Sequence, residues 1–434
     1  MRSFLASSIG VAALAALTVP LAAAAPAASA VVPAAAAEPA GSTQSLPLTP
    51  LPGANRVGGS ASQEGLAVRE VRPFSLVGVV WDNADDELHG SVQVRTRARA
   101  SGTWSGWQDL ETHNHDHAAD PGTPEAARPL HGSTAPLWVG DSDAVEARVS
   151  AEAPEDGQDA VPLPEGMRLD LVDPGAGPAE GEAGETTRAA RTPDVLPALD
   201  KAASEAEAES VSERKPESES GEVSGAEGLA RPYAGPRPRI ITRKGWGADE
   251  RLRERGFVYT KSVKVVFVHH TASGNGYTCA QAPSVLRSIY RYHVKSSGWR
   301  DIGYNFAVDK CGNIYEGRAG GVAKAVMGAH TLGFNTNSTG VAVIGTYTRT
   351  SPSAAALKAV EKLSAWKLGL YGLNPAGKST LISGGGNRYK KGRSVRFNAI
   401  AGHRDGYATD CPGTRLYSRL GAARVTAAHY QGRR

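Results

Sequence analysis

Two histidines and one cysteine in the C-terminal half of this 434-residue chain carry side chains that can hold a metal ion. His269 follows an apolar run, and His403 precedes Cys411 by eight residues in a stretch rich in turn-forming residues. Two imidazoles and one thiolate are sufficient for a catalytic zinc site that keeps one open position. The spacing alone is also compatible with loop residues that never meet.

Two other catalytic patterns are missing from residues 236–434. This part of the sequence contains neither a Gly-x-Ser-x-Gly elbow nor a Gly-x-Gly-x-x-Gly loop. The first pattern would indicate a serine hydrolase, and the second would indicate a dinucleotide-binding enzyme. The remaining residues therefore favour a metal-dependent reaction.

The three cysteines are too few for a disulfide-rich scaffold, but their odd number is informative. If Cys279 pairs with Cys311, Cys411 is left without a partner. A free thiol is a liability in an exported protein, and zinc coordination would hold it as a thiolate. We therefore predict a disulfide between Cys279 and Cys311 and a metal-binding role for Cys411.

The elements that must position these side chains alternate between strands and helices. Residues 263–268 form an apolar run of the buried-strand type that ends at His269 and His270, and residues 400–402 form a short strand before His403. Further strands are expected at 305–308, 314–316 and 340–347, and helices at 283–295, 353–370 and 414–430. This order predicts an α/β domain with a central mixed β-sheet and flanking helices over residues 236–434.

The first 30 residues have the pattern of a secretory signal peptide. Arg2 is followed by an Ala-rich apolar run with small-residue cleavage motifs at residues 23–25 and 28–30. A membrane anchor is the alternative, but Ser7, Ser8 and Pro20 interrupt the run. We therefore expect residues 1–30 to be removed and the mature protein to be secreted.

The rest of the N-terminal half divides into three segments. Residues 31–64 are rich in Ala, Pro, Ser and Gly and are expected to be a flexible leader. Residues 65–175 contain short alternating runs separated by Gly and Pro, which predicts a small β-sandwich-like accessory domain. Residues 176–235 hold Glu, Ser, Ala and Pro with almost no large apolar residue, and they are expected to be an acidic disordered linker.

Two clusters in the β-rich segment leave alternatives open. Trp104 and Trp107 could stack on sugar rings, although packing against the sheet is the commoner role. His113, His115 and His117 alternate in sequence and could bind a metal, but a solvated loop is the simpler interpretation because no partner ligand is identifiable.

The modest net charge of +4 conceals two opposed halves. Residues 1–235 carry 16 basic and 35 acidic side chains, a net charge of −19. Residues 236–434 carry 32 basic and 9 acidic side chains, a net charge of +23. Such asymmetry indicates separate modules and a polyanionic partner for the basic one.

The basic half resembles the peptidoglycan recognition protein and N-acetylmuramoyl-L-alanine amidase family, the type-2 amidases that include phage T7 lysozyme. The resemblance covers about residues 241–416 in ordered blocks. The blocks include Ile241-Thr242-Arg243-Lys244-Gly245-Trp246-Gly247, Val268-His269-His270-Thr271-Ala272, Gly303-Tyr304-Asn305-Phe306, Ile314-Tyr315-Glu316-Gly317-Arg318 and the stretch from His403 to Gly413. So many blocks in the same order are far more specific than any single motif.

The resemblance implies roles for individual residues. The family's zinc ligands fall on His269, His403 and Cys411, its catalytic tyrosine falls on Tyr304, and the position two before the ligand cysteine falls on Thr409. Phage members carry Lys at that last position and the recognition-protein amidases carry Thr, so this chain is similar to the latter. The positions expected to contact substrate are His293, Trp299, Arg318, His330 and Asn335.

The resemblance also implies a function. We expect a secreted, zinc-dependent amidase that hydrolyses the amide between N-acetylmuramic acid and L-Ala of peptidoglycan stem peptides. The alternative is a peptidoglycan-binding protein that does not cleave. Peptidoglycan and anionic wall polymers are the expected partners of a monomeric protein, and neither nucleic acid nor, after signal cleavage, a membrane is expected.

Two departures from the family pattern limit what the resemblance implies. Many eukaryotic members have Gly-Trp after the Glu-Gly-Arg motif, a pair associated with diaminopimelate recognition, whereas Arg318 is followed here by Ala319 and Gly320. The stem-peptide preference therefore stays open. Residues 374–399 resemble an insertion, and their Gly-rich, basic composition is that of a loop beside the groove.

Overall fold

The computed structural model describes residues 41–52, 56–57, 60–112, 116–153, 161–177, 194–213 and 233–434. The described residues all lie in one compact unit, Pro39–Arg434. The expected signal peptide lies outside the described residues. Within the described part of the chain, no helix has both the length and the apolar character needed to cross a bilayer.

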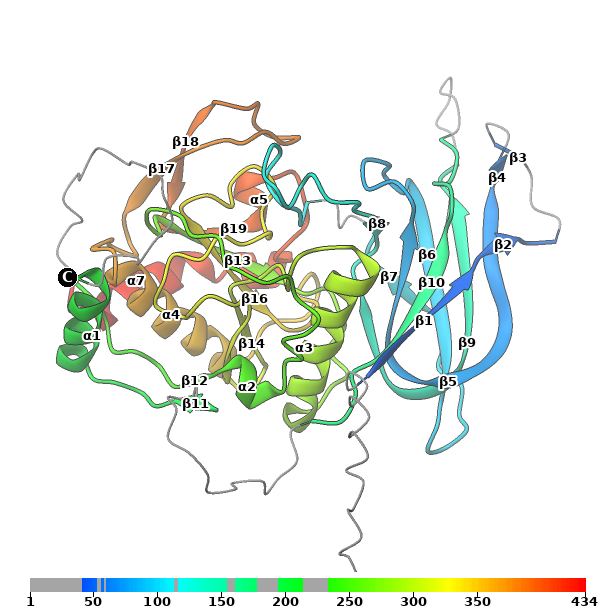
Figure 1. Cartoon of the computed structure of the whole chain (residues 1–434), viewed down its shortest axis with the longest axis horizontal. Coiled ribbons are helices and arrows are strands. Elements are labelled where there is room, and N and C mark those ends of the chain that lie inside the picture. Colours follow the sequence, from blue (N-terminus) through cyan, green and yellow to red (C-terminus); the bar gives the residue numbers. More distant parts are fainter. Residues whose placement is uncertain are drawn as a thin grey trace, which may run out of the picture. The chain divides into compact units, whose positions relative to one another are not determined.

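The N-terminal domain is a β-sandwich, drawn in blue to green-cyan in Figure 1. Its strands are β1 (Ser42–Pro47), β2 (Thr49–Pro50), β3 (Arg56–Val57), β4 (Ser60–Ala61), β5 (Gln63–Trp81), β6 (Gly90–Ala98), β7 (Gln108–Leu110), β8 (Gly132–Ser133), β9 (Leu137–Ala151) and β10 (Arg168–Asp173). The β5–β9 pairing changes register three times, and such irregularities bend strands so that one strand can serve both layers. In β6, Val92, Val94 and Thr96 are buried while the residues between them are not, which agrees with the predicted alternation.

The sheet of this domain starts earlier than the sequence suggested. Strand β1 lies in the segment expected to be a flexible leader, yet it pairs antiparallel with β10 from Ser42 to Pro47. An edge strand is held by backbone hydrogen bonds, so its side chains need not carry an apolar pattern. Trp104 and Trp107 are half-buried, and the guanidinium of Arg95 lies over both rings at 5.4 and 5.2 Å. This contact favours the packing role.

The C-terminal domain has a seven-stranded mixed sheet in the order β11-β12-β15-β14-β16-β13-β19. The strands are β11 (Val195–Leu196), β12 (Ile240–Ile241), β13 (Val265–His270), β14 (Phe306–Val308), β15 (Ile314–Glu316), β16 (Ser338–Val343) and β19 (Ile400–Gly402), and a separate hairpin joins β17 (Lys378–Ile382) to β18 (Ser394–Asn398). Neighbours are parallel except β11–β12 and β14–β15, which confirms the predicted mixed sheet.

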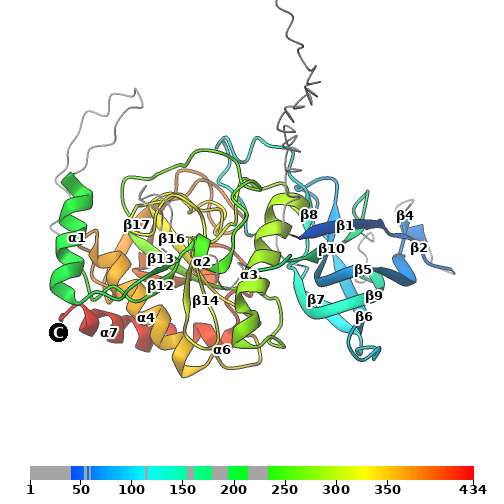
Figure 2. The same cartoon turned by 60° about the horizontal axis from the view of Figure 1, so that its bottom comes forward.

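Helices lie on both faces of this sheet. They are α1 (Lys201–Glu213), α2 (Arg243–Trp246), α3 (Ala282–Arg291), α4 (Ala354–Gly369), α5 (His403–Gly406), α6 (Thr414–Tyr417) and α7 (Leu420–Tyr430), with a 3-10 turn η1 (Cys279–Gln281) and a π-helical turn η2 (Tyr292–Ser296). In Figures 1 and 2, α4 and α7 run side by side. The helix predicted over residues 414–430 is thus two helices, and α1 lies inside the segment expected to be a disordered linker.

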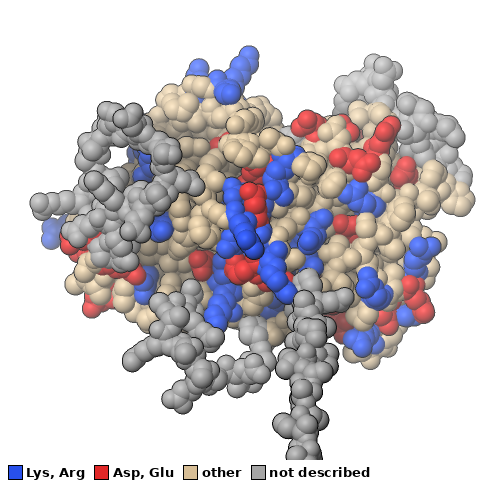
Figure 3. Space-filling model, viewed as in Figure 1, with Lys and Arg blue, Asp and Glu red and all other residues tan. Residues whose placement is uncertain are grey.

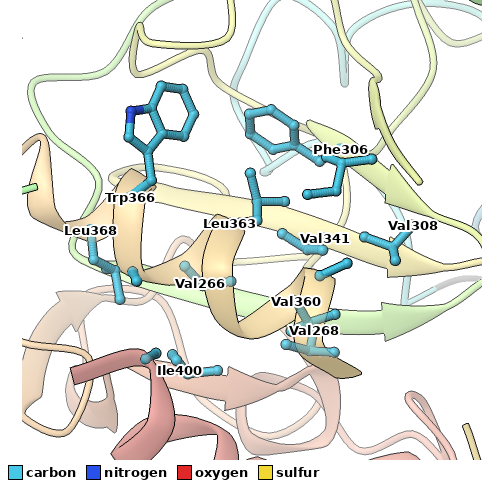
Figure 4. Close-up of a cluster of buried hydrophobic side chains, with 14 of the residues drawn as sticks. Val266, Val268, Phe306, Val308, Val341, Val360, Leu363, Trp366, Leu368 and Ile400 are labelled. Atoms are coloured by element: carbon cyan, nitrogen blue, oxygen red, sulfur yellow. The ribbon is translucent and has the colours of Figure 1, made fainter. Parts of the chain in front are cut away.

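The core beneath α4 is largely apolar. Val360, Leu363 and Trp366 of α4 pack over Val266 and Val341 of the sheet (Figure 4), and every one of these side chains is at most 1% exposed. On the opposite face, Ala342 packs in the cluster that contains α3. The alternation along β16 therefore divides its side chains between two cores, as expected for a sheet that is buried on both sides.

The basic character of this domain is not concentrated on the face seen in Figure 3. On the described part of that face, Lys and Arg side chains are interspersed with Asp and Glu. The β17–β18 hairpin differs, because its tip carries four exposed cations: Arg388, Lys390, Lys391 and Arg393. This hairpin contains most of the segment that the sequence marked as a basic insertion.

Candidate functional site

Two neighbouring strands bring the two predicted histidine ligands together. The parallel register of β13 and β19 aligns Val268 with Gly402. The next residue in each strand direction is His269 or His403, so both imidazoles lie at the same edge of the sheet. The loop after α5 then returns Cys411 to this edge. This is where side chains gather in open α/β sheets, beyond the carboxyl ends of parallel strands.

The side-chain atoms of this cluster are spaced for a common metal ion. Cys411 Sγ lies 3.7 Å from His269 Nδ1. A tetrahedral zinc ion with ordinary Zn–S and Zn–N bonds would hold sulfur and nitrogen about 3.6 Å apart. Both ring nitrogens of His403 are buried and have no hydrogen-bond partner among the described residues. An orphaned imidazole between a second imidazole and a thiol fits a zinc ion, whose preferred ligands are nitrogen and sulfur.

A fourth ligand comes from the N-terminal domain. His117 joins His269, His403 and Cys411 in a buried group whose ligand atoms all lie within 4.8 Å of one another. His117 Nε2 is 4.0 Å from Cys411 Sγ, and its Nδ1 is 2.8 Å from Asp116 Oδ1. The interpretation of this histidine as part of a solvated loop is therefore wrong, because His117 is only 7% exposed. His113 and His115 lie outside the described residues.

The electrostatics of the cluster suit metal ligands. Burial lowers the pKa of His403 to about 3, and burial together with the neighbouring imidazoles holds the pKa of His269 well below its usual range. Both rings are therefore neutral at pH 7 and offer a lone pair. Burial raises the pKa of the Cys411 thiol well above its ordinary value, so a bound cation would be needed to keep it as a thiolate.

Hydrogen bonds orient the ligand rings from behind. His269 Nε2 lies 3.3 Å from His330 Nδ1, which leaves His269 Nδ1 to face the cluster. The Asp116 carboxylate holds His117 Nδ1 and lies 3.7 Å from His403 Nδ1. Carboxylate partners of this kind fix the ring tautomer and raise ligand basicity in metal sites.

Tyr304 and Thr409 lie beside the cluster. The Tyr304 ring is 5.6 Å from the rings of both His117 and His269. Burial raises its pKa well above the usual value, so its hydroxyl keeps its proton and can donate a hydrogen bond. Thr409 is partly exposed, and its Oγ1 accepts a hydrogen bond from Cys411 N at 3.1 Å.

The five residues expected to contact substrate are all buried: His293, Trp299, Arg318, His330 and Asn335. His293 stacks on Trp299 with ring centroids 4.4 Å apart and accepts a hydrogen bond from Gly303 N through Nδ1. His330 lies behind His269. Arg318 and Asn335 bind acidic residues of the chain itself, as described next.

Those acidic residues belong to residues 116–131, which we call the bridging segment because it runs from the metal cluster along the C-terminal domain. Glu125 binds the Arg318 guanidinium through two contacts of 2.7 and 2.9 Å. Asp120 Oδ1 accepts from Asn335 Nδ2 at 2.7 Å. Two of the five positions that the sequence assigned to substrate, Arg318 and Asn335, are therefore occupied by acidic residues of the protein's own N-terminal domain.

A cavity of about 900 Å³ lies between the bridging segment and the C-terminal domain. His117 and Pro121 line one side, and Trp299, Leu332 and Tyr407 line the other. Gly385, Gly386 and Asn387 of the β17–β18 hairpin also border it, which agrees with the interpretation of this insertion as a loop beside the groove. Its volume is within the range of small-molecule sites.

The remaining motif residues have structural roles. Trp246 is fully buried and donates from Nε1 to Glu316 O at 2.7 Å. His270 accepts from Tyr347 N, and it is not part of the metal cluster. Asp405 accepts from Gly402 N at 2.9 Å, which makes it a turn residue. The predicted disulfide between Cys279 and Cys311 is present.

One stretch has the sequence motif of a phosphate-binding loop but not its structure. Residues 372–379 read Gly-x-x-x-x-Gly-Lys-Ser. A phosphate-binding loop joins a strand to a following helix, so that the helix N-terminus faces the phosphates. Here helix α4 precedes the stretch, and strand β17 begins within it at Lys378. The order is reversed, and the stretch therefore has no such role.

Comparisons with known proteins agree with this site. Residues 259–414 match the family model described as N-acetylmuramoyl-L-alanine amidase, and residues 28–180 match the model described as Rv3811 N-terminal galactose-binding domain-like. The chain is 30% identical over 181 residues to peptidoglycan-recognition protein SC2 of Drosophila simulans, which covers 42% of this chain and 84% of that protein. It is 34% identical over 185 residues to the N-acetylmuramoyl-L-alanine amidase of Homo sapiens, covering 42% of this chain and 28% of that protein.

Among solved structures, wild-type Drosophila PGRP-LB is similar at 26% identity with a TM-score of 0.34, covering 42% of this chain and 92% of that one. The sequence relatives are the stronger finding, because the alignment covers 84% of the Drosophila protein. The residues matched by the amidase family model, 259–414, include His269, His403 and Cys411. The C-terminal domain thus makes this chain a member of the family of peptidoglycan-recognition proteins and N-acetylmuramoyl-L-alanine amidases.

Proposed function

We propose that this chain is a secreted zinc-dependent N-acetylmuramoyl-L-alanine amidase. Its substrate is the amide that joins the lactyl group of N-acetylmuramic acid to L-Ala of the stem peptide. One observation carries this proposal: His269, His403 and Cys411 converge at one sheet edge with Tyr304 beside them. Zinc at this cluster would supply a Lewis acid and lower the pKa of a bound water to about 7.

The protein's own groups account for the rest of the chemistry. The Tyr304 hydroxyl, which keeps its proton, can donate a hydrogen bond to the oxyanion that forms when the amide carbonyl is attacked. Thr409 can donate a second, although its hydroxyl now accepts from Cys411 N. His330 and Asp116 hold the ligand rings in place, so that the cluster needs little rearrangement during the reaction.

The wider setting follows from the same proposal. The signal-peptide pattern in residues 1–30 supports export, and the four exposed cations at the β17–β18 tip would attract anionic wall polymers. The Drosophila relative is named a peptidoglycan-recognition protein and the human relative an N-acetylmuramoyl-L-alanine amidase, which supports peptidoglycan as the partner. We assign the amidase domain to residues 236–434 and an accessory role to the β-sandwich.

A second candidate is a peptidoglycan-binding protein that does not cleave. The observation that favours it is the fourth side chain: with His117 present, the cluster has four protein ligands, the number typical of structural zinc sites. The two candidates differ in whether this fourth position ever becomes available to water.

The test is digestion of purified sacculi by the zinc-loaded full chain and by its His117→Ala variant, each beside a Cys411→Ala counterpart. Free stem peptides, identified by mass, are expected from a chain that keeps Cys411 and from neither counterpart. Release of no stem peptide by any of the four proteins would rule out the amidase and leave the binding protein.

A further inference from the structure

His117 is a fourth possible metal ligand at a site where a catalytic zinc ion needs only three. Three ligands from the C-terminal domain already suffice for catalysis, and the fourth position of such sites is normally held by water or substrate. His117 Nε2 points to this position at 4.0 Å from Cys411 Sγ, and its ring packs edge-on against His403 with centroids 4.6 Å apart. The Asp116 contact at Nδ1 fixes the tautomer that presents Nε2 as a ligand.

The rest of the bridging segment covers the surface beside the metal cluster. Leu332 N donates to Asp116 O at 3.0 Å, and Gly333 N donates to Asp120 Oδ1 at 2.9 Å. Further along, Glu125 binds Arg318, and both side chains are at most 8% exposed. The segment therefore follows the C-terminal domain from the His–Cys cluster to Arg318, over residues expected to contact substrate.

The contacts of the segment are of a kind that can be exchanged for water. They are chiefly charged and polar hydrogen bonds, whose groups regain hydration when the segment leaves. The cavity of about 900 Å³ beside it shows that the segment is not packed tightly against the C-terminal domain along its whole length. Its displacement would not require the apolar cores to open, since its buried contacts are confined to this surface.

We propose that the bridging segment is an intramolecular inhibitor. It supplies His117 as a fourth metal ligand and occupies the substrate groove, so that substrate reaches the metal only after the segment is displaced. This inference rests on the proposed amidase function, because inhibition has meaning only for an enzyme. The proposal explains why a chain with all three zinc ligands of an amidase has its site covered by the bridging segment in this structure.

The decisive experiment reports on the metal and not on activity. The full chain is loaded with Co²⁺, whose visible absorption responds to coordination number and ligand type, and is then titrated with azide. In the wild type we expect no response, because His117 fills the fourth position. In His117→Ala we expect azide to change the spectrum, and added imidazole to restore the wild-type spectrum. His89→Ala, an exposed histidine of the same domain, is the matched control and should behave as the wild type does.

The second measurement is the rate of sacculus digestion by the zinc-loaded proteins. His117→Ala should release stem peptides roughly tenfold faster or more, because only the open fraction of the wild type is competent. An azide response in the wild type equal to that of His117→Ala would overturn the proposal, and so would release of stem peptides by both proteins at the same rate. Failure of the amidase function itself is recognised separately: no protein then releases stem peptides, whatever the azide titrations show.

Discussion

The N-terminal domain touches the C-terminal domain in two regions of opposite character. Against helix α3, Leu76, Val80 and Val172 of the sandwich share one apolar cluster with Leu286 and Ile289, all at most 1% exposed. Along the bridging segment, the contact consists of carboxylates bound to Arg318, Asn335 and backbone N–H groups. The first region is held by apolar packing, as in a protein core. The second is held by charged and polar hydrogen bonds, as in the binding of a polar ligand.

The difference indicates which contact is permanent. Apolar surface at the α3 contact gains nothing from exposure to water, so this contact holds the sandwich in place. Charged groups of the bridging segment are solvated well when released, so their contact has a modest net free energy. The α3 contact can therefore hold the two domains together while the bridging segment leaves the groove and substrate takes its place. The predictions below test this division.

The largest effect is expected from the buried ion pair. Replacing Glu125 by Gln leaves the Arg318 guanidinium buried without its counter-charge, which costs roughly 3 to 5 kcal/mol. Because Arg318 is hydrated once the segment leaves, this cost should favour local opening and not global unfolding. Amide hydrogen exchange should accelerate across residues 116–131, while the thermal midpoint of the whole chain changes little.

The matched control for that prediction is Glu254→Gln. Glu254 of the C-terminal domain forms an ion pair with Arg128 of the bridging segment, but the Glu254 side chain is 44% exposed. Exposed pairs contribute at most about 1 kcal/mol, so exchange in the segment should stay near the wild-type rate. Equal acceleration in both variants would show that the buried pair is not what holds the segment.

The second prediction concerns Lys367, a titratable side chain buried beside the apolar core. Lys367 of α4 donates from Nζ to Val322 O and Lys324 O, and burial lowers its pKa to about 7. Between pH 7 and the ordinary lysine value near 10.4, the unfolded chain binds one more proton than the folded chain. The free energy of unfolding should therefore rise from pH 7 to pH 9 by roughly 2 to 3 kcal/mol.

Urea unfolding at several pH values checks this, with the Lys367→Met variant as the reference. The free energy of unfolding of the wild type, relative to that of Lys367→Met, should increase between pH 7 and pH 9. Lys358→Met, an exposed position on the same helix, should leave the pH profile of the wild type unchanged. A wild-type profile that is parallel to that of Lys367→Met would contradict a neutral lysine in this core.

The third prediction targets the apolar contact directly. A Cβ at Gly78 would overlap the Tyr292 hydroxyl, which donates to the carbonyls of Val79 and Thr134. Gly78→Ala should therefore reduce the free energy of unfolding by about 1 to 3 kcal/mol, measured by urea denaturation. Gly106→Ala is the control, because a Cβ there meets nothing within 4 Å. An unchanged free energy of unfolding in Gly78→Ala would show that the contact is looser than the structure indicates.

The features that could be predicted from the sequence are those with a local pattern. His269 and His403 follow apolar strands whose pattern is local, so their place at a sheet edge could be inferred from the amino-acid sequence alone. The odd number of cysteines pointed to Cys411, and the resemblance added Tyr304 and Thr409. The apolar sheet and the covering helix α4 were equally accessible, because burial on one face imposes a periodic pattern.

The contribution of His117 could not be inferred in this way. It lies 152 residues before His269 in sequence, in a loop without periodicity, and nothing local shows that the loop crosses to another domain. The one available signal was Asp116, which lies between His115 and His117 in sequence. A carboxylate beside a histidine is typical of oriented metal ligands. Strand β1 was missed for a related reason, since its pairing rests on backbone groups that every residue carries.

The smallest effect is expected where the apolar core meets solvent, at the start of α4. Ser353 caps this helix: its Oγ accepts from Ala356 N at 3.0 Å and donates to Lys310 O. Ser353→Ala should lower the free energy of unfolding by about 1 kcal/mol, since an uncapped N–H is left at the helix terminus. Ser351→Ala, at an exposed position before the cap, should change it much less. Because α4 packs only on the core of the C-terminal domain, amide exchange in residues 116–131 should stay unchanged in Ser353→Ala. Faster exchange there would mean that the bridging segment depends on the core behind the sheet, and the two contact regions would no longer be separable.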